Sequence, residues 1–456
     1  MPSALRAVPG SPMKRRGHAT PNSRLLPGVL VLGLAFTGSA PGAERTTSGP
    51  TAYEKDVDFL LTELGKQSGH FFEQKKIDWK AVEKRFRGEV KKVKSDVEHV
   101  KLCARLLAQL EDGHAGITDS KVKLPDETGG QRWTGPRVHL VPMGKGVYVL
   151  ASFKDALSSG IEPGMEVLRI DGEPARRWLE KKVIAMREEG QGYSTDHQAL
   201  HAACHWGLAA AEGTRIAFEL RDLRGRKKTV AITRRGGPNY APLGPAFPPE
   251  GLEPLGRQSY TKTASGFGYI HLRDVPGDLP DQIDRMLAKL GEIPGLILDM
   301  RANGGGGCDH EAVFGRFLAP GETWRQYTGQ GSKPYTGPMV VIIDAGVRSA
   351  GETVAGMLKE DGRAYLIGDT PTAGMSSQKA TLAVPSGLFT VRFSVHSNKS
   401  RFNGGKGIEG IGVAPHQIVP YQPADLAAGV DTLIRRAEEL LKKGLPAGVV
   451  PYPGKK

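Results

Sequence analysis

The sequence has few cysteines and lacks the spacings that mark common metal sites. Its three cysteines, Cys103, Cys204 and Cys308, are widely separated among 456 residues. No C-x-x-C pair and no Cys/His metal-ligand spacing occurs, and at most one disulfide could form. The sequence therefore predicts neither a disulfide framework nor a metal site, and we expect no cofactor.

A basic stripe interleaved with aromatic residues is also missing, although the chain is basic. The formal net charge is +13. Residues 1–43 contain five basic residues and no acidic one, so their removal leaves 13 − 5 = +8. The remaining positive charge is scattered, and nucleic acid is not an expected partner. A basic surface can favour acidic partners or an anionic envelope, which leaves peripheral membrane association open.

No apolar run is long enough for an ordinary membrane span. The run from Leu25 to Ala40 is interrupted by Pro27 and is short beside the roughly 20 residues that a span needs. Basic residues at Lys14–Arg16 precede it and small residues follow it, a pattern typical of a signal peptide. Residues 1–43 are predicted to export the chain to the periplasm or the exterior, with an uncleaved N-terminal anchor as the alternative.

The length of the chain predicts two or three domains. Residues 44–124 have helical periodicity, residues 130–236 are rich in expected strands, and residues 254–442 alternate strands with helices before a tail at 443–456. Such alternation predicts an α/β domain around a buried central sheet. The expected fold class is therefore multidomain α/β.

One serine lies where an apolar strand is expected to turn into a helix. The strand Met339–Asp344 is followed by Arg348-Ser349-Ala350-Gly351-Glu352. A serine at this position can be a nucleophile, with the next N–H at a helix N-terminus donating to an oxyanion. Ser349 can equally be a helix N-cap that forms a capping box with Glu352, and both roles can coexist.

A glycine run follows a second buried strand. Leu298-Asp299-Met300-Arg301 leads into Asn303 and the glycines 304–307. Clustered glycines let backbone N–H groups converge on an anion. The run lacks the Lys-Ser/Thr of a P-loop and the spacing of a dinucleotide-binding loop. We expect Asp299 and Arg301 to brace the loop.

Taken in order, these motifs resemble a known family. Gly268-Tyr-Ile, the Asn303 glycine loop, the Ser349 turn, the 367–374 segment and Ile408-Glu409-Gly-Ile-Gly-Val succeed one another as in tail-specific (C-terminal-processing) serine proteases. The resemblance implies a ClpP/crotonase-like core. The 160–172 string Gly-Ile-Glu-Pro-Gly-Met-Glu-Val-Leu-Arg-Ile-Asp-Gly resembles a PDZ domain, which binds extended peptides by strand addition.

The resemblance also indicates which base would activate Ser349. Met375 occupies the position of the lysine of the Ser–Lys branch, and methionine cannot accept a proton. Lys379 remains an alternative base. The Asp112-Gly113-His114 motif resembles that of the tricorn core protease, so His114 is the predicted general base and Glu409 the predicted acidic partner. Gly113 occupies the position of a tricorn serine, which leaves the connection between Glu409 and His114 open.

The family resemblance implies an exported serine endopeptidase that cleaves unfolded or C-terminally recognised polypeptides. We predict Ser349, His114 and Glu409 as catalytic residues, with oxyanion donors at Ala350 and Gly305 or Gly304. The expected partner is a polypeptide substrate with an extended chain end. One alternative is a catalytically silent relative that binds a peptide or an apolar ligand, as the retinoid-binding relatives do. Another is an acyl hydrolase, although the G-x-S-x-G elbow is absent.

Overall fold

The computed structural model describes residues 50–125, 133–237, 240–397 and 401–452. These residues belong to one compact unit. The predicted signal peptide, residues 1–43, lies outside the described residues. Within these ranges, no helix is both long and apolar enough to cross a membrane.

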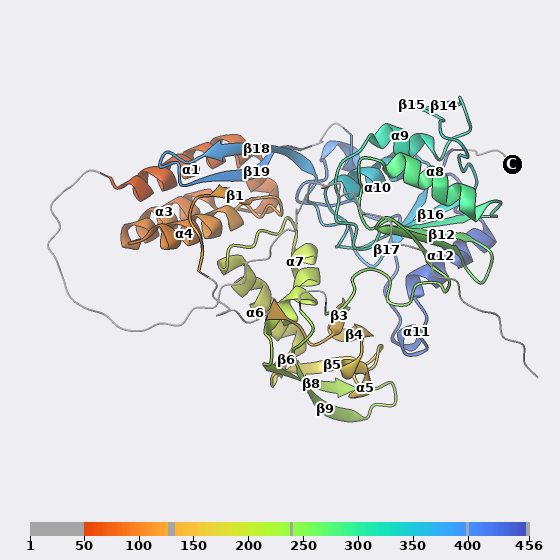
Figure 1. The fold of residues 1–456 in the computed structure, drawn as a ribbon, viewed down its shortest axis with the longest axis horizontal. Helices are drawn as coiled ribbons and strands as arrows, with labels where there is room; N and C mark the ends of the chain where they lie inside the picture. Colours follow the sequence, from red (N-terminus) through yellow and green to blue (C-terminus); the bar gives the residue numbers. More distant parts are fainter. Residues whose placement is uncertain (1–49, 126–132, 238–239, 398–400, 453–456) are drawn as a thin grey trace, which may run out of the picture. The chain divides into compact units, whose positions relative to one another are not determined.

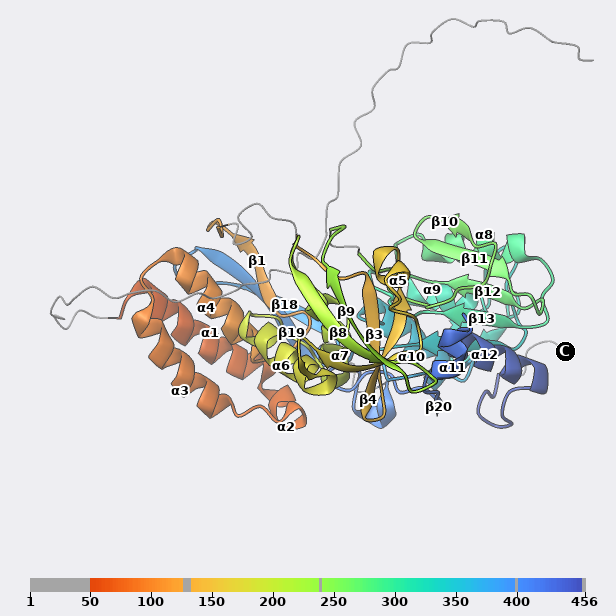
Figure 2. The ribbon, with the colours of Figure 1, turned by 90° about the horizontal axis from the view of Figure 1, so that it is seen from below.

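The N-terminal part folds as helices packed on a small sheet (Figure 2). The helices are α1 (Ala52–Ser68), α2 (Phe72–Lys75), α3 (Trp79–Glu89) and α4 (Asp96–Ala108), with 3₁₀ turns at Gly69–Phe71 and Val90–Lys92. The antiparallel sheet has the order β1 (Gly116–Ser120), β19 (Phe389–Ser397), β18 (Ser377–Ala383). Leu60 and Phe86 share a core with Val391 and Phe393 of β19. The sheet thus joins the predicted helical segment to the C-terminal half of the chain.

The middle segment folds as an antiparallel sheet with its own core. Its strands are β3 (Val138–Met143), β4 (Gly146–Ser152), β5 (Glu166–Ile170), β8 (Arg215–Arg221) and β9 (Lys227–Thr233), in that order, with β6 (Glu173–Pro174) beside β5. Its helices are α5 (Asp155–Ser158), α6 (Ala175–Glu188), α7 (Asp196–Ala203) and a 3₁₀ turn at Trp206–Leu208. The strands β2 (Trp133–Thr134) and β7 (Ala210–Ala211) pair separately. The expected β-rich unit is present, and its identity as a PDZ domain remains a prediction.

The C-terminal half is built on a seven-stranded sheet. Its order is β10 (Glu253–Leu255), β11 (Gln258–Lys262), β12 (Gly268–His271), β13 (Leu296–Asp299), β16 (Met339–Ile343), β17 (Tyr365–Gly368), β20 (Gln417–Ile418). The pairings from β12 to β20 are parallel, whereas β10 and β11 are antiparallel. Each residue of β12, β13, β16 and β17 is buried. Continuous burial is typical of a parallel sheet covered on both faces and explains the unbroken apolar runs in the sequence.

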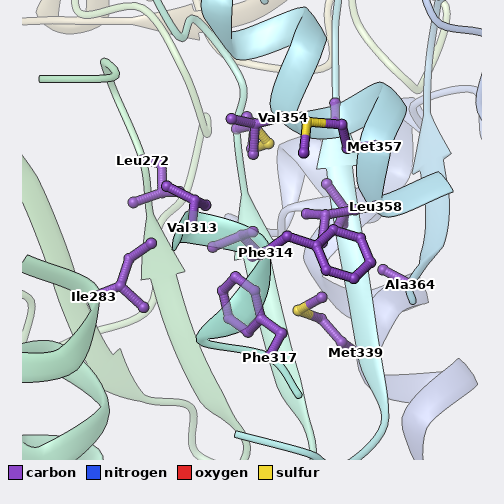
Figure 3. Close-up of a cluster of buried hydrophobic side chains, with 14 of the residues drawn as sticks. Leu272, Ile283, Val313, Phe314, Phe317, Met339, Val354, Met357, Leu358 and Ala364 are labelled. Atoms are coloured by element: carbon purple, nitrogen blue, oxygen red, sulfur yellow. The ribbon is translucent and has the colours of Figure 1, made fainter. Parts of the chain in front are cut away.

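Helices cover both faces of this sheet (Figure 1). The helices are α8 (Leu279–Leu290), α9 (His310–Gly315), α10 (Ala350–Glu360), α11 (Pro423–Ala427) and α12 (Thr432–Lys443); the hairpin β14 (Thr323–Trp324) and β15 (Tyr327–Thr328) and a 3₁₀ turn at Asn403–Gly405 complete the elements. Alternate strand residues face α8, α9 and α10 on one side, in the cluster drawn in Figure 3, and α12 on the other. The predicted multidomain α/β class is confirmed.

Candidate active site

A strained turn presents Ser349 after the buried strand β16. Ser349 has φ 55° and ψ −125°, a backbone conformation that is unfavourable for a non-glycine residue by about 1–3 kcal/mol. The Ser349 N–H donates to Oε2 of Glu352 at 3.1 Å, and the N–H of Arg348 donates to the Asn303 carbonyl at 3.0 Å. These contacts stabilise the turn. Ser349 is thus the N-cap residue of α10 and also presents its hydroxyl toward another segment.

That segment brings His114 to the serine from far upstream in the chain. Nε2 of His114 lies 3.3 Å from Oγ of Ser349. The His114 N–H donates to Oδ1 of Asp112 at 2.8 Å, and Oδ2 of Asp112 accepts the Ser394 N–H at 2.7 Å. Asp112 therefore fastens the loop after α4 to strand β19. The structure brings together the two residues predicted as nucleophile and base.

The surroundings of His114 favour a neutral imidazole. Burial, together with the positive charges of Lys379, Arg392 and Arg348, lowers the pKa of His114 to about 4, against the opposing effect of Asp112. A neutral imidazole can accept the proton of a serine hydroxyl. Nδ1 of His114 is buried and has no hydrogen-bond partner among the described residues. The imidazole thus has one nitrogen at the serine and one free for an orienting group.

Glu409 lies beside His114 in a buried cluster. Asp112 and Glu409 each have a carboxylate oxygen, and His114 a ring nitrogen, and these three atoms lie within 4.8 Å of one another. Oε1 of Glu409 accepts hydrogen bonds from Nζ of Lys75 at 2.8 Å and from Oγ of Ser194 at 3.0 Å. Oε2 is buried and has no partner in the described part of the chain. Burial and the Asp112 charge raise the pKa of Glu409 to about 7, and the Lys75 ammonium opposes this rise.

The same three residues have the spacing of metal ligands, but their contacts suit a different role. Both oxygens of Asp112 already accept backbone N–H groups. The ammonium of Lys75 occupies one oxygen of Glu409, and neither side chain of that pair is more than 2% exposed. A buried cation already balances the carboxylate. The arrangement therefore favours proton transfer over metal binding.

Ser194 and Lys75 are contacts of Glu409 that the sequence analysis missed. Oγ of Ser194 accepts the Gly113 N–H at 3.0 Å while it donates to Glu409. It thus supplies a hydroxyl beside Gly113, where the resemblance to tricorn left one missing. The local sequence gives no signal for this role, because Ser194 precedes a helix N-cap at Thr195. Only the tertiary fold brings these segments together.

Met375 fills the space beside Gly113. Met375 is 5% exposed, and a Cβ built on Gly113 would lie 2.8 Å from its Sδ. A serine at position 113 would therefore require Met375 to move. Lys379 lies on β18 and forms no hydrogen bond to Ser349. Among the described residues, His114 is the titratable base within hydrogen-bond distance of the serine hydroxyl.

Glu352 joins the nucleophile turn to the Met375 segment. Besides the Ser349 N–H, it accepts the hydroxyl of Thr372 at 2.6 Å and the N–H groups of Gly374 and Met375 at 2.6 and 2.8 Å. Burial raises the pKa of Glu352 to about 8, although these donors act in the opposite direction. The sequence indicated the capping role of Glu352. The longer-range contacts depend on the tertiary fold.

Of the three predicted oxyanion donors, Ala350 has a free N–H. It donates to no acceptor in the described part of the chain. The N–H of Gly305 donates to Oδ1 of Asn303 at 2.9 Å, and that of Gly304 donates to the Arg273 carbonyl at 2.9 Å. In this conformation the glycine loop therefore uses both of these N–H groups internally. Gly305 nevertheless lies against Ser349, and its role remains a proposal.

Buried ion pairs brace the glycine loop, as expected for Asp299 and Arg301. Arg301 is fully buried and pairs with Asp299 at 2.6 Å and with Asp431 at 2.9 Å. The two carboxylates compensate the buried guanidinium. The three cysteines are free, so no disulfide stabilises the site. The geometry around Ser349 is held by hydrogen bonds and ion pairs.

Comparison with known proteins identifies similar sequences among peptidases. The profile of peptidase family S41 matches residues 266–419. A carboxyl-terminal-processing protease of Picosynechococcus sp. is 26% identical over 189 residues, 39% of this chain and 44% of the relative. A tricorn protease homolog of Streptomyces coelicolor is 24% identical over 397 residues, 81% of this chain and 31% of the relative. The matches therefore span less than half the length of these curated relatives.

Solved structures show the same fold over a longer part of the chain. The structure of mature CPAF complexed with lactacystin aligns with a TM-score of 0.63 at 15% identity, covering 86% of this chain and 98% of that one. A second structure of mature CPAF aligns with a TM-score of 0.62 at 15% identity, covering 88% of this chain and 98% of that one. At this identity the likeness concerns the fold alone.

Proposed function

Because the chain contains a peptidase family S41 domain over residues 266–419, we propose that it is a serine endopeptidase that acts through an acyl-enzyme at Ser349. The observation that carries the proposal is the 3.3 Å approach of His114 Nε2 to Ser349 Oγ. This contact joins two segments 235 positions apart, and the strained conformation at Ser349 is of the kind found at functional sites.

In the proposed mechanism, Oγ of Ser349 attacks the scissile carbonyl carbon while Nε2 of His114 accepts the hydroxyl proton. The carbonyl oxygen becomes an oxyanion, to which the N–H of Ala350 at the start of α10 donates. His114 then gives its proton to the leaving amine as the C–N bond breaks. In the second half, His114 activates a water molecule that hydrolyses the acyl-enzyme and releases Ser349.

Glu409 is proposed to stabilise the imidazolium that forms during each half-reaction. Oε2 of Glu409 and Nδ1 of His114 are both buried without partners in the described ranges. A water molecule or a substrate hydroxyl between them would satisfy both, since buried water is held by two or more polar groups. Lys75 and Ser194 would act as positioning residues, because they hold the other oxygen of Glu409.

The second oxyanion donor is proposed to come from the glycine loop. A Cβ built on Gly305 would lie 2.7 Å from Cβ of Ser349, so this backbone directly adjoins the nucleophile. Its N–H would become available if Asn303 Oδ1 released it when the substrate binds. Catalytic hydrogen bonds often reach their final geometry only in the complex with substrate.

The finer features of the function follow from the sequence and belong to the same proposal. The substrate would be an unfolded polypeptide or an extended chain end, delivered by strand addition to the PDZ-like middle segment. The basic residues near the N-terminus and the short apolar run that follows them support export to the periplasm or the exterior. A catalytically silent binding protein would have no need for a strained serine facing a neutral imidazole.

Cleavage of an unfolded protein tests the proposal. We expect the purified chain to degrade a denatured, reduced substrate and Ser349→Ala to have no activity while it retains the wild-type circular dichroism spectrum. Ser158→Ala, an exposed serine on α5, is the matched control and should retain full activity. Undiminished cleavage by Ser349→Ala would refute the assignment of the nucleophile.

A further inference from the structure

Three basic side chains near the active site have no partner among the residues that the structure describes. They are Arg348, next to the nucleophile, and Lys379 and Arg392 on strands β18 and β19. No ion pair or side-chain hydrogen bond connects any of them to another residue in the described part of the chain. Arg348 and Arg392 are exposed, and Lys379 is partly buried. Lys75, by contrast, is paired with Glu409.

The register of the small sheet places Lys379 and Arg392 on the same face. Lys379 lies opposite Ser394, and Arg392 lies opposite Thr381 of β18. Residues two apart on a strand point to the same side, so the two basic residues are diagonal neighbours. The residues on either side of Arg392 in β19, Val391 and Phe393, point to the opposite face and are buried against the N-terminal helices. The basic face is therefore the face that those helices leave uncovered.

This basic face adjoins His114. Arg392 also lies opposite Gly116 of β1, two residues beyond His114, and glycine leaves room for the arginine side chain. Ser394, two residues from Arg392, is hydrogen-bonded to the Asp112 carboxylate that holds the His114 loop. The positive charges of Lys379, Arg392 and Arg348 each lower the pKa of His114, which places all three within electrostatic reach of the imidazole.

The carboxylates that act electrostatically on Lys379 are those of Asp112, Glu409 and Glu352, and all three are buried and already hydrogen-bonded. Asp112 accepts two backbone N–H groups, Glu409 is paired with Lys75, and Glu352 accepts four hydrogen bonds. Arg348 and Arg392 are exposed, so the charge that this region offers to a substrate is positive.

We propose that Arg348, Lys379 and Arg392 form a cationic wall that selects polypeptides with aspartate or glutamate side chains beside the scissile bond. The inference rests on the proposed peptidase function and adds a substrate class to it. Guanidinium groups bind carboxylates through two parallel hydrogen bonds, and an ammonium adds a point charge. A bound carboxylate would also offset the positive field at His114, which would favour its protonation during the reaction. Acidic substrates should thus have a higher kcat as well as a lower KM.

Matched peptides test the proposal. One series has Asp or Glu at each position flanking a mapped cleavage site, and the other has Asn or Gln there; every peptide has an amidated C-terminus, with free-acid versions in parallel. We expect kcat/KM to be about tenfold higher for the acidic peptides, the order of one charge-assisted hydrogen bond. The preference should shrink in high salt, since exposed charges are screened.

Variants assign the preference to the wall. Arg392→Gln, Lys379→Met and Arg348→Gln should each reduce the ratio of acidic to amide kcat/KM severalfold. Lys289→Met, an exposed residue of α8, removes the same charge elsewhere and should leave the ratio unchanged. Binding of the same peptides to Ser349→Ala, followed by fluorescence anisotropy, measures the preference without turnover.

The outcomes separate this inference from the peptidase proposal. Cleavage with equal rates for acidic and amide peptides, or equal binding to Ser349→Ala, would overturn the cationic wall and leave the peptidase proposal intact. A preference that is present with free-acid peptides and absent with amidated ones would also overturn it. The wall would then bind the C-terminal carboxylate of the peptide and not its acidic side chains. Tighter binding of acidic peptides without any cleavage would support the wall and contradict the peptidase.

Discussion

Lys75 and Glu409 form a buried ion pair with 2.8 Å between Nζ and Oε1. Lys75 also donates to the carbonyl of Glu111 at 2.7 Å, just before the loop that carries His114. One ammonium thus connects the acidic partner of the site to the segment that holds the base. Glu409 depends on this contact, because burial and Asp112 both act to neutralise it.

Lys75→Met should impair catalysis by neutralising Glu409. Without the ammonium, the pKa of Glu409 should rise above about 7 and the carboxyl should be protonated at neutral pH. We expect kcat to fall by roughly 10²-fold, within the range that general acid–base groups contribute. Raising the pH should restore part of the rate as Glu409 ionises, which a pH profile of kcat would reveal.

A double variant serves as the control for stability. Lys75→Met leaves an unpaired buried carboxyl and should lower the free energy of unfolding by about 3–5 kcal/mol. Adding Glu409→Gln replaces the unpaired carboxyl with a neutral amide and should recover part of the loss in urea denaturation. If the double variant is less stable by the sum of the two single effects, the pair is not coupled.

His114→Ala and Lys379→Met should differ strongly if His114 is the base. His114→Ala should reduce activity to the residual level of Ser349→Ala, because nucleophile and base act as one unit. Lys379→Met should keep the rate on uncharged peptides within about fivefold, since an unpaired charge contributes little. A mild loss in His114→Ala together with a severe loss in Lys379→Met would transfer the role of base to Lys379.

The depressed pKa of His114 predicts a specific loss of stability in acid. Its pKa is about 4 in the folded protein against 6.5 for the ordinary side chain. Between these values the unfolded chain binds a proton that the folded chain does not, so stability falls as the pH drops from about 6.5 to about 4. The effect on the free energy of unfolding is on the order of 3 kcal/mol.

Urea denaturation at pH 7 and pH 4 measures this effect. His114→Gln should lose less stability over the interval than the wild type, whereas His396→Gln, at an exposed position, should behave as the wild type. An unchanged difference between the two pH values in His114→Gln would show that His114 titrates normally.

Gly305→Ala should disrupt the nucleophile turn. Gly305 has φ 78°, and an added Cβ would lie 2.7 Å from Cβ of Ser349 and 2.8 Å from the Arg348 carbonyl. Since backbone blocks that space, we expect kcat to fall by about 10²-fold or more. Gly307→Ala is the matched control, because a Cβ there meets nothing within 4 Å. Equal activity of the two variants would contradict this account of the turn.

The sequence predicted the elements of the site better than their connections. The strand before Ser349 and the helix after it were readable because both are continuous apolar patterns that end at a turn. Resemblance supplied His114, whose distance along the chain no local pattern bridges. Met375 stands where the Ser–Lys branch has its lysine, and its side chain fills the space beside Gly113.

The contacts of Lys75, Ser194 and Asp112 could not be predicted in the same way. Each joins segments that are far apart in sequence, and each residue has an ordinary local role at or near a helix end. The pairing of β1 with β19 was likewise missed, because short strands with polar faces give weak periodicity. The hydrogen bond from the Gly305 N–H to Asn303 likewise could not be predicted from the sequence.

Active-site labelling tests the central claim most directly. A fluorophosphonate probe forms a covalent bond with an activated serine, and mass spectrometry of the digested protein locates the modified residue. We predict labelling of Ser349 in the wild type, none in Ser349→Ala, and a loss of at least about 10²-fold in labelling rate in His114→Ala. Labelling at another residue, or an undiminished rate in His114→Ala, would contradict the assignment of Ser349 and His114 as nucleophile and base.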